Sequence, residues 1–239
     1  MGILSGVHPT AVVSCAADVA DDVRIGPYAV IHAGVRLASG VTVDAHAVLG
    51  GDPQDLSFTG GPTCLEIGAN TAVREGAIIH RATTAARPTR IGADCLIMGQ
   101  THIGHDCWIG DGVVVAQQSA LAGHVTVGDG VVVGGKCGVH QHVRIGSRAM
   151  IGAMAKVTRD VLPFCAVDGI PATHRALNVI GLRRAGIVGD DYRALRAAFH
   201  LLRAGEEIPD GCTALVATLA EFLAGRSLRG ISPFHREAR

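Results

Sequence analysis

The segment at residues 101–110, THIGHDCWIG, contains the side chains that most often transfer protons or bind metal ions. His102 and His105 lie three positions apart, and Asp106 and Cys107 follow His105 directly. A neutral histidine can accept a proton from a hydroxyl group near neutral pH when an acceptor orients its other ring nitrogen. Asp106 is a local candidate for that acceptor. The segment therefore predicts a general base, a metal site, or polar residues on an exposed turn.

Aliphatic residues recur at every sixth position through most of the chain. The series runs from Val7 to Leu49, resumes from Ile67 to Ile79, and continues from Ile91 to Val157. A helix has a period of about 3.6 residues and an ordinary strand alternates, so neither element explains this spacing. Repeats of six are typical of a parallel β-helix, in which each hexapeptide forms one face and one corner of a three-sided coil. The spacing therefore predicts an all-β parallel β-helix.

Two segments interrupt the repeat. Residues 50–66, GGDPQDLSFTGGPTCLE, are rich in glycine and proline and predict an extruded loop. Residues 83–90, TTAARPTR, predict a shorter loop. Because loops that leave a repeat scaffold often carry binding residues, we expect substrate contacts in these segments.

The repeat ends after Pro163, and a helical pattern follows. Apolar residues at helical spacing predict one helix from about residue 190 to residue 203, capped by the aspartates at 190 and 191, and a second over about residues 212–224. Gly205 and Gly225 are expected to end these helices. We therefore predict a β-helix domain over residues 1–162, including the loop at 50–66, and a small C-terminal α-helical region over residues 163–239.

The charge and composition exclude several classes of partner. The chain has 21 basic and 21 acidic side chains, so no overall positive field attracts nucleic acid. The arginine-rich part after residue 174 favours an acidic partner. No apolar run is long enough to span a membrane. Seven cysteines without paired spacing and the lack of a signal peptide predict reduced thiols and a cytoplasmic protein.

Three histidines are expected to share one corner of the β-helix. His105, His124 and His140 are separated by nearly one coil, about 18 residues in a three-sided hexapeptide coil. A single histidine at such a place is often only an exposed turn residue. Three on successive coils favour a functional site.

The repeat over roughly residues 7–162 resembles the left-handed β-helix acyltransferases, and this resemblance, not the periodicity, implies a left-handed coil. Further segments resemble the UDP-N-acetylglucosamine acyltransferases, the LpxA family. They are VHPTAVV, PQDLSF, REGAIIHRAT, THIGHDC, SALAGHV, GVHQ and NVIGLRRAG, and they occur in the family's order. Exposed faces of a β-helix favour lateral association, so we expect a homotrimer. The resemblance implies an enzyme without a cofactor. It implies transfer of a (3-hydroxy)acyl chain from acyl carrier protein to the sugar 3-hydroxyl of UDP-N-acetylglucosamine, the first step of lipid A biosynthesis.

The resemblance also implies a role for each residue that matches a family motif. His105 matches the general base, Asp106 the residue that orients it, and Gly123 the backbone N–H that stabilises the oxyanion. Ala153 matches the residue that limits the acyl groove, with Met154 beside it, and alanine in place of glycine predicts a medium-length chain. The implied substrate-binding residues are Gln54, Asp55, His80, His102, His124, His140, Gln141, Asn178 and Arg184.

Three positions depart from the family pattern. Ser57 stands where the family usually has lysine, Ile180 where it has glutamate, and Ala185 where it has a second arginine. These changes remove charges near the expected nucleotide and donor sites. An LpxA-like enzyme that acts on a different nucleotide sugar or an amino sugar, by O- or N-acylation in secondary metabolism, is therefore the alternative.

Zinc hydratases share the hexapeptide fold and are an alternative of another class. In these hydratases, two of the zinc ligands are histidines five residues apart. No two histidines of this chain have that spacing. Structural zinc sites usually need four Cys or His ligands in close pairs, and the chain has no C-x-x-C. We therefore predict no metal site.

Overall fold

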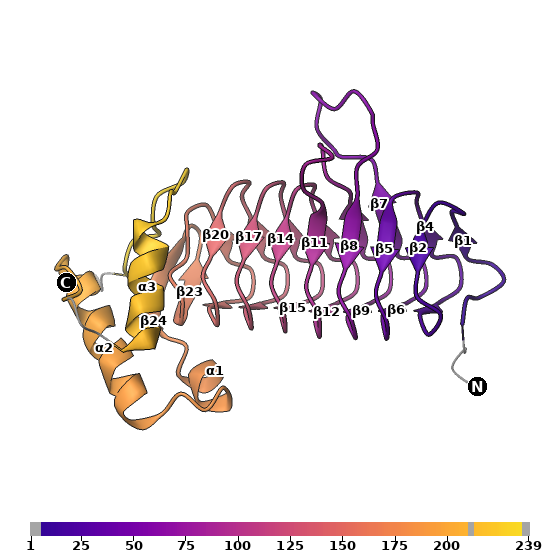
Figure 1. Ribbon diagram of the computed structural model, residues 1–239. Helices are drawn as coiled ribbons and strands as arrows, with labels where there is room; N and C mark the ends of the chain where they lie inside the picture. Colours follow the sequence, from indigo (N-terminus) through magenta and orange to yellow (C-terminus); the bar gives the residue numbers. More distant parts are fainter. Residues whose placement is uncertain (1–5, 210–212, 236–239) are drawn as a thin grey trace.

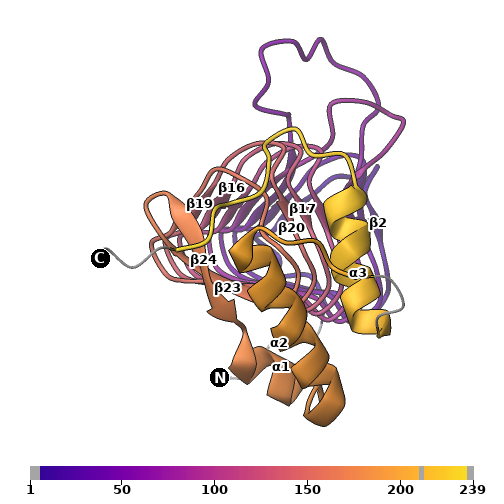
Figure 2. The ribbon, with the colours of Figure 1, turned by 90° about the vertical axis from the view of Figure 1, so that its left-hand side faces the viewer.

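The chain forms a three-sided parallel β-helix with helices at its C-terminal end (Figure 1). The structure is a computed structural model that describes residues 6–209 and 213–235. Seen from the C-terminal end, the stacked coils have a triangular outline, and α2 and α3 lie in front of them (Figure 2). The parallel β-helix predicted from the six-residue repeat is confirmed.

The chain visits three sheets in turn, which are named here in the order of their first strands. The first sheet contains β1 (Val12–Val13), β4 (Val30–Ile31), β7 (Val48–Gly51), β10 (Ile78–His80), β13 (His102–Ile103), β16 (Ala120–Leu121), β19 (Gly138–Val139) and β22 (Lys156–Val157). The second contains β2 (Asp18–Val19), β5 (Val35–Leu37), β8 (Leu65–Ile67), β11 (Thr89–Ile91), β14 (Trp108–Ile109), β17 (Thr126–Val127) and β20 (Arg144–Ile145). The third contains β3 (Arg24–Ile25), β6 (Thr42–Val43), β9 (Ala72–Val73), β12 (Leu96–Ile97), β15 (Val114–Val115), β18 (Val132–Val133), β21 (Met150–Ile151), β23 (Cys165–Gly169) and β24 (Ala172–Leu177).

One aliphatic residue of each hexapeptide points into the prism. Ile103, Ile109, Val115 and Leu121 are consecutive members of the series, and each is fully buried. Neighbouring residues on these two- and three-residue strands face outward, because side chains alternate along a strand. The chain turns many corners through residues with a positive φ. This geometry leaves only the corners and one outward position on each face for polar side chains.

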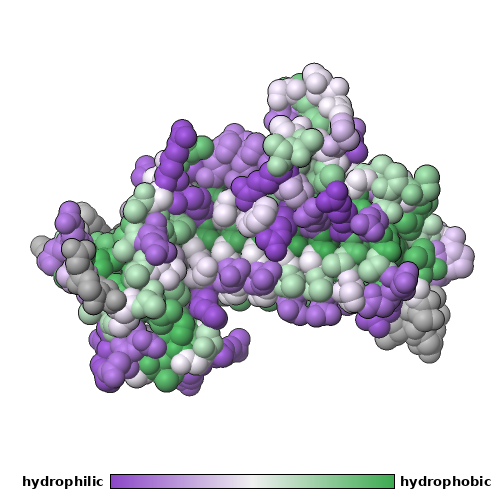
Figure 3. All heavy atoms as spheres, viewed as in Figure 1, coloured by the Kyte–Doolittle hydropathy of each residue, from purple (hydrophilic) through white to green (hydrophobic). Residues whose placement is uncertain are grey.

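The two loops leave the prism at the corner that follows the first sheet. The longer one joins β7 to β8 over residues 52–64, and the shorter one joins β10 to β11 over residues 81–88. The longer loop stands clear of the prism in the space-filling view (Figure 3). The Arg81 guanidinium lies 2.6 Å from the Asp52 carboxylate and 5.8 Å from the centre of the Phe58 ring, which ties the two loops together.

The third sheet continues beyond the end of the repeat. β23 pairs in parallel with β21, and β24 returns antiparallel to β23. The six-residue pattern did not predict this hairpin, because its strands are longer and do not belong to a coil. The β-structure therefore extends past residue 162, and the first helix begins at Val179.

Three helices follow the hairpin: α1 (Val179–Arg184), α2 (Gly189–Ala204) and α3 (Ala214–Ala224). The sequence predicted α2 and α3 but not the short α1, and residues 210–212 at the expected start of α3 lie outside the described part. Asp190 and Asp191 lie in the first turn of α2, whereas the N-cap residue is Val188 and makes no side-chain hydrogen bond. Gly205 ends α2 in the left-handed conformation, as expected. None of the described helices is long and apolar enough to cross a membrane.

The helices share a second apolar core with the end of the β-helix. Leu182, Leu195 and Leu219 come from the three helices and are buried against Leu162 and Phe164. Helices this short have little stability in isolation, so this packing is what stabilises them.

A last segment, residues 225–235, runs back along the coils. The N–H of Asp160 donates to the carbonyl of Gly230, and the N–H of Ser232 donates to the carbonyl of Asp160. Buried His174 donates from Nδ1 to the carbonyl of Ser232, and its Nε2 accepts from the N–H of Leu162. This C-terminal segment is thereby fastened beside the corner that follows the first sheet.

Replacing an inward-facing residue should destabilise the coil stack. Leu121→Ala removes a fully buried side chain, and we expect it to lower the free energy of unfolding by about 2–5 kcal/mol. Leu56→Ala is the matched control, because Leu56 lies in the longer loop and is fully exposed. Guanidinium unfolding of both variants measures the difference. Equal unfolding midpoints for the two would contradict the inward packing.

Candidate active site

Three histidine rings stack along the corner that follows the first sheet. The ring centres of His105 and His124 lie 5.1 Å apart, edge to face, and those of His124 and His142 lie 4.6 Å apart, face to face. His142, which the sequence analysis did not single out, takes the place in the stack that we expected for His140. Asp106, His124 and His142 all turn the corner with φ near +60°. A spacing of one full coil from His124 was the signal for His142.

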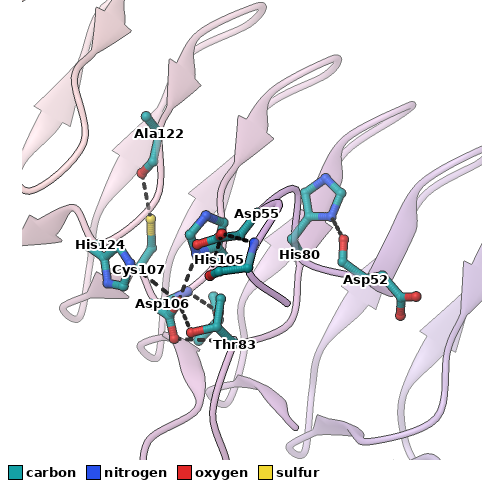
Figure 4. Close-up of polar contacts among 11 residues, drawn as sticks. Asp52, Asp55, His80, Thr83, His105, Asp106, Cys107, Ala122 and His124 are labelled. Atoms are coloured by element: carbon teal, nitrogen blue, oxygen red, sulfur yellow. Dashed lines mark hydrogen bonds and ion pairs between the residues drawn. The ribbon is translucent and has the colours of Figure 1, made fainter. Parts of the chain in front are cut away.

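His105 and Asp106 form the pair predicted from their adjacency. His105 Nδ1 lies 2.7 Å from Asp106 Oδ2, and both side chains are largely buried (Figure 4). Because the carboxylate accepts, Nδ1 carries the hydrogen and Nε2 keeps its lone pair. The pair is therefore arranged for His105 Nε2 to accept a proton.

Asp106 is held as an anion. Burial opposes its ionisation, but hydrogen bonds from His105 and from the side chain and N–H of Thr83 keep the pKa of Asp106 below its usual value. The Thr83 hydroxyl lies 2.8 Å from Oδ2, and the Thr83 N–H lies 3.1 Å from Oδ1. An ionised Asp106 can stabilise the imidazolium that forms when His105 takes up a proton.

Gly123 lies against the ring of His105. A Cβ at this position would come within 2.5 Å of His105 Cε1 and 2.6 Å of Nε2. A Cβ on Gly104 would come within 2.7 Å of the Gly123 nitrogen. Among the described residues, the N–H of Gly123 donates to no backbone carbonyl. Glycine at both positions thus leaves room for the ring and for an acceptor at the Gly123 N–H.

The longer loop brings Asp55 to the same place. Both the N–H and the hydroxyl of Ser57 donate to Asp55 Oδ1, at 2.8 and 2.7 Å, and they lower the pKa of Asp55. Ligand atoms of Asp55, His105 and His124 all lie within 4.8 Å of one another. These three side chains are close enough to bind a metal ion together or to bond to one polar group of a substrate.

His80 and His102 form a second pair on the first sheet. Their ring centres lie 5.2 Å apart, and His80 Nδ1 donates to the carbonyl of Asp52 at 2.6 Å. Burial, followed by the proximity of His80 and His105, lowers the pKa of His102. Nε2 of both rings is buried and has no hydrogen-bond partner within the described residues. Both nitrogens can therefore bond to a ligand.

Cys107 does not take part in chemistry. Its Sγ donates to the carbonyl of Ala122 at 3.2 Å, and burial raises the pKa of the thiol to about 12. At neutral pH it remains a thiol, which excludes it as a nucleophile. Its place inside the corner is that of a small core residue.

Three predicted substrate residues do not belong to the histidine stack. Gln54 is exposed on the loop beside Asp55. His140 and Gln141 precede His142 and contact the C-terminal segment: Arg229 Nε donates to the Gln141 carbonyl at 2.8 Å, and its guanidinium contacts His140 Nδ1. Arg229 therefore joins the two parts of the chain at this end of the corner.

Four predicted residues lie elsewhere in the single chain. Asn178 caps α1 by accepting from the N–H of Gly181 at 3.1 Å, and it donates to the carbonyl of Arg148, which turns the corner after the second sheet. Arg184 is exposed at the end of α1, on the side of the molecule opposite the loops (Figure 1). Ala153 and Met154 lie at the corner that follows the third sheet. One chain therefore does not bring these residues to His105.

Substituting Gly123 should displace the base. In Gly123→Ala the new Cβ would overlap the His105 ring, so we expect the ring to move away from its present position. A misplacement of about 1 Å costs roughly 100-fold in turnover. Gly138→Ala is the matched control, because a Cβ there meets nothing within 4 Å. Steady-state rates and a crystal structure of each variant test this, and full activity of Gly123→Ala would contradict it.

Comparison with known sequences identifies two matching families. Residues 160–232 match the family model described as domain 2 of UDP-N-acetylglucosamine O-acyltransferase. Residues 88–123 match the model for the hexapeptide repeats of bacterial transferases. The two matches cover the helical end and the part of the β-helix that carries His105 and Asp106.

Individual relatives extend the likeness to nearly the whole chain. An acyl-[acyl-carrier-protein]–UDP-N-acetylglucosamine O-acyltransferase of Saccharophagus degradans is 41% identical in an alignment 255 residues long. The alignment covers 94% of this chain and 98% of the relative. One from Akkermansia muciniphila is 45% identical over 214 residues, covering 82% and 83%. The solved structure of LpxA from Acinetobacter baumannii superposes with a TM-score of 0.76 at 33% identity, covering 95% of this chain and 99% of that one. This likeness confirms the left-handed β-helix. The chain therefore belongs to the UDP-N-acetylglucosamine O-acyltransferase family.

Proposed function

We propose that this protein transfers a (3-hydroxy)acyl chain from acyl carrier protein to the sugar 3-hydroxyl of UDP-N-acetylglucosamine. The observation that carries the proposal is the His105–Asp106 pair, with Nδ1 held at 2.7 Å by a carboxylate and Nε2 available as a base. The printed names of the relatives support these two substrates. In this role the protein would catalyse the first step of lipid A biosynthesis.

The transfer follows from the chemistry of this pair. His105 Nε2 takes the proton of the sugar hydroxyl while the hydroxyl oxygen attacks the carbonyl carbon of the thioester. The tetrahedral intermediate then expels the carrier thiolate, which receives the proton from the imidazolium. Asp106 stabilises the positive charge of His105 between these two steps. Base catalysis of this kind contributes about 10²–10⁴ in rate.

The oxyanion of the intermediate is assigned to the N–H of Gly123. This group lies one coil after His105 and beside its ring, and a backbone N–H carries no cost of reorientation when charge develops. No cofactor is required, because attack on a thioester needs only a base and an oxyanion donor.

The surrounding groups are assigned to the sugar. The Asp55 carboxylate is ionised and can accept from a hydroxyl or an amide of the acceptor. The buried Nε2 atoms of His80 and His102, on the first sheet, can form hydrogen bonds with the sugar. His124 lies beside His105 on the next coil. Gln54 is exposed next to Asp55 on the longer loop.

We infer that the active enzyme is a homotrimer. Asn178, Arg184, Ala153 and Met154 match nucleotide and acyl contacts, yet they lie at other corners of the chain than His105. A neighbouring chain that packs against the His105 corner can supply them. His140, Gln141 and Arg229 lie at the end of that corner where a neighbour's helical region would approach.

The acidic carrier protein is assigned to the helical end. Exposed arginines gather there, and they suit association with an acidic partner. They include Arg183, Arg184, Arg196 and Arg203. A cytoplasmic location is part of the proposal and is supported by the described cysteines, all of which are free thiols.

The alternative of a different nucleotide sugar or an amino sugar is not favoured by the relatives. The three residues that depart from the family pattern each occupy a defined place in the structure. Ser57 caps the Asp55 carboxylate, Ile180 is exposed on α1, and Ala185 follows the last turn of α1.

Removal of the base should abolish transfer without disturbing the fold. We expect His105→Ala to lower kcat by about 10²–10⁴ with little change in the KM for UDP-N-acetylglucosamine. His32→Ala, an exposed histidine near the N-terminal end of the β-helix, is the control. Product formation from acyl-[acyl-carrier-protein] measures both, and a chelator should leave the wild type fully active. Unchanged turnover of His105→Ala would refute the base, and loss of activity on chelation that added zinc restores would show that transfer needs a metal ion.

Chain length should respond to residue 153. Ala153 adds one methyl group where glycine would leave space, so we expect a medium-length optimum for the wild type. Ala153→Gly should move that optimum towards longer chains, and a series of carrier-linked donors of graded length measures the shift. A wild-type optimum at long chains that Ala153→Gly leaves unmoved would contradict the assignment.

A further inference from the structure

The shorter loop reaches the catalytic pair through Thr83. The Thr83 hydroxyl donates to Asp106 Oδ2 at 2.8 Å, and its N–H donates to Oδ1 at 3.1 Å (Figure 4). Oδ2 is also the oxygen that accepts from His105 Nδ1 at 2.7 Å. Both oxygens of the carboxylate are thus bound, and one of them is shared between the threonine and the base.

The other end of the same loop holds the backbone of Asp106. The Asp106 N–H donates to Oγ1 of Thr89 at 2.8 Å, and Thr89 is fully buried at the start of β11. Asp106 has a φ of 58°, a conformation that side chains other than glycine adopt at a cost. The bond to Thr89 compensates for that cost. The side chain of Asp106 is therefore held by a residue of the loop, Thr83, and its backbone by Thr89, the residue that directly follows the loop.

The part of the loop next to β11 contacts the coil that carries the pair. The Arg87 guanidinium lies 3.9 Å from the centre of the Trp108 ring, and Trp108 directly follows Cys107 on β14. A cation over an aromatic face is stabilising, although modestly so on a surface. This contact keeps Thr83 and Thr89 in register with Asp106.

We propose that Thr83 is a positioning residue for acyl transfer, which holds the Asp106 carboxylate in the orientation and charge state that His105 needs. The inference rests on the proposed function, because it takes His105 as the base. Thr83 acts through Asp106, so its removal should affect kcat and its pH dependence more than the binding of the acceptor.

The direction of the effect follows from the shared oxygen. Without the threonine hydroxyl, His105 Nδ1 at 2.7 Å is the nearest side-chain group to Oδ2, with His124 Nε2 next at 3.7 Å, and the carboxylate accepts from His105 more strongly. A stronger acceptor favours the imidazolium, so His105 stays protonated to a higher pH. The acidic limb of the kcat/KM profile should therefore move upward by about 0.5–1 pH unit. Looser orientation of the ring should lower kcat about tenfold.

The test compares Thr83→Val, which removes the hydroxyl and keeps the shape, with Thr83→Ser, which keeps the hydroxyl. Thr42→Val on β6 of the third sheet is the matched control far from the pair. Rates with UDP-N-acetylglucosamine and acyl-[acyl-carrier-protein] are measured across pH, together with the melting temperature. We expect the upward shift of the acidic limb of the kcat/KM profile, and the lower kcat, only in Thr83→Val. The KM for UDP-N-acetylglucosamine should stay unchanged. A wild-type pH profile for a folded Thr83→Val would overturn the proposal.

A double variant separates positioning from a merely structural role. If Thr83 acts through Asp106, adding Thr83→Val to Asp106→Asn should cause little further loss. Fully additive losses would overturn the proposal. If Thr83→Val does not fold, Thr83→Ala replaces it in the same comparisons. An inactive His105→Ala with an unshifted Thr83→Val rejects only the positioning role, whereas an active His105→Ala rejects the base itself.

Discussion

Burial of one aliphatic side chain in every hexapeptide is the constraint on which the rest of the molecule depends. Ile103, Ile109 and Leu121 are fully buried, and each fixes which way its neighbours can point. A one-residue slip would turn every buried side chain outward, so the register cannot drift along the stack. Polar residues are confined to the corners and outward positions. The chemistry of the protein is therefore restricted to a small number of places before any ligand is considered.

Coil stacking converts spacing along the chain into proximity in space. Parallel strands lie about 4.8 Å apart, and the histidine rings at one corner are separated by 5.1 and 4.6 Å. The same stacking brings Gly123 against His105, where any side chain would collide with the ring. The proposed base and the proposed oxyanion donor thus come from successive coils, and neither requires an irregular backbone.

The loops supply what a regular coil cannot. Each breaks the hexapeptide series, and each contributes a hydroxyl group to a carboxylate: Ser57 to Asp55, and Thr83 to Asp106. In both cases the hydrogen bonds lower the pKa of the aspartate. Two anions can consequently lie beside a cluster of histidines, one facing the expected acceptor and the other holding the base.

The sequence by itself determined the β-helix and its two loops, because a six-residue period states which residues point inward and where the series is interrupted. It offered His105 and Asp106 as a candidate pair, and the structure showed their contact. Only the tertiary structure decided that His142 stacks on His124, since the exact corner position depends on backbone conformation. Only the structure showed the contact of Thr83 with Asp106, because the inserted loop does not follow the six-residue repeat and its position cannot be read from residue spacing. It also separated Asn178, Arg184 and Ala153 from His105, since motif order along a chain does not say which corner a residue occupies or whether a neighbouring chain completes the site.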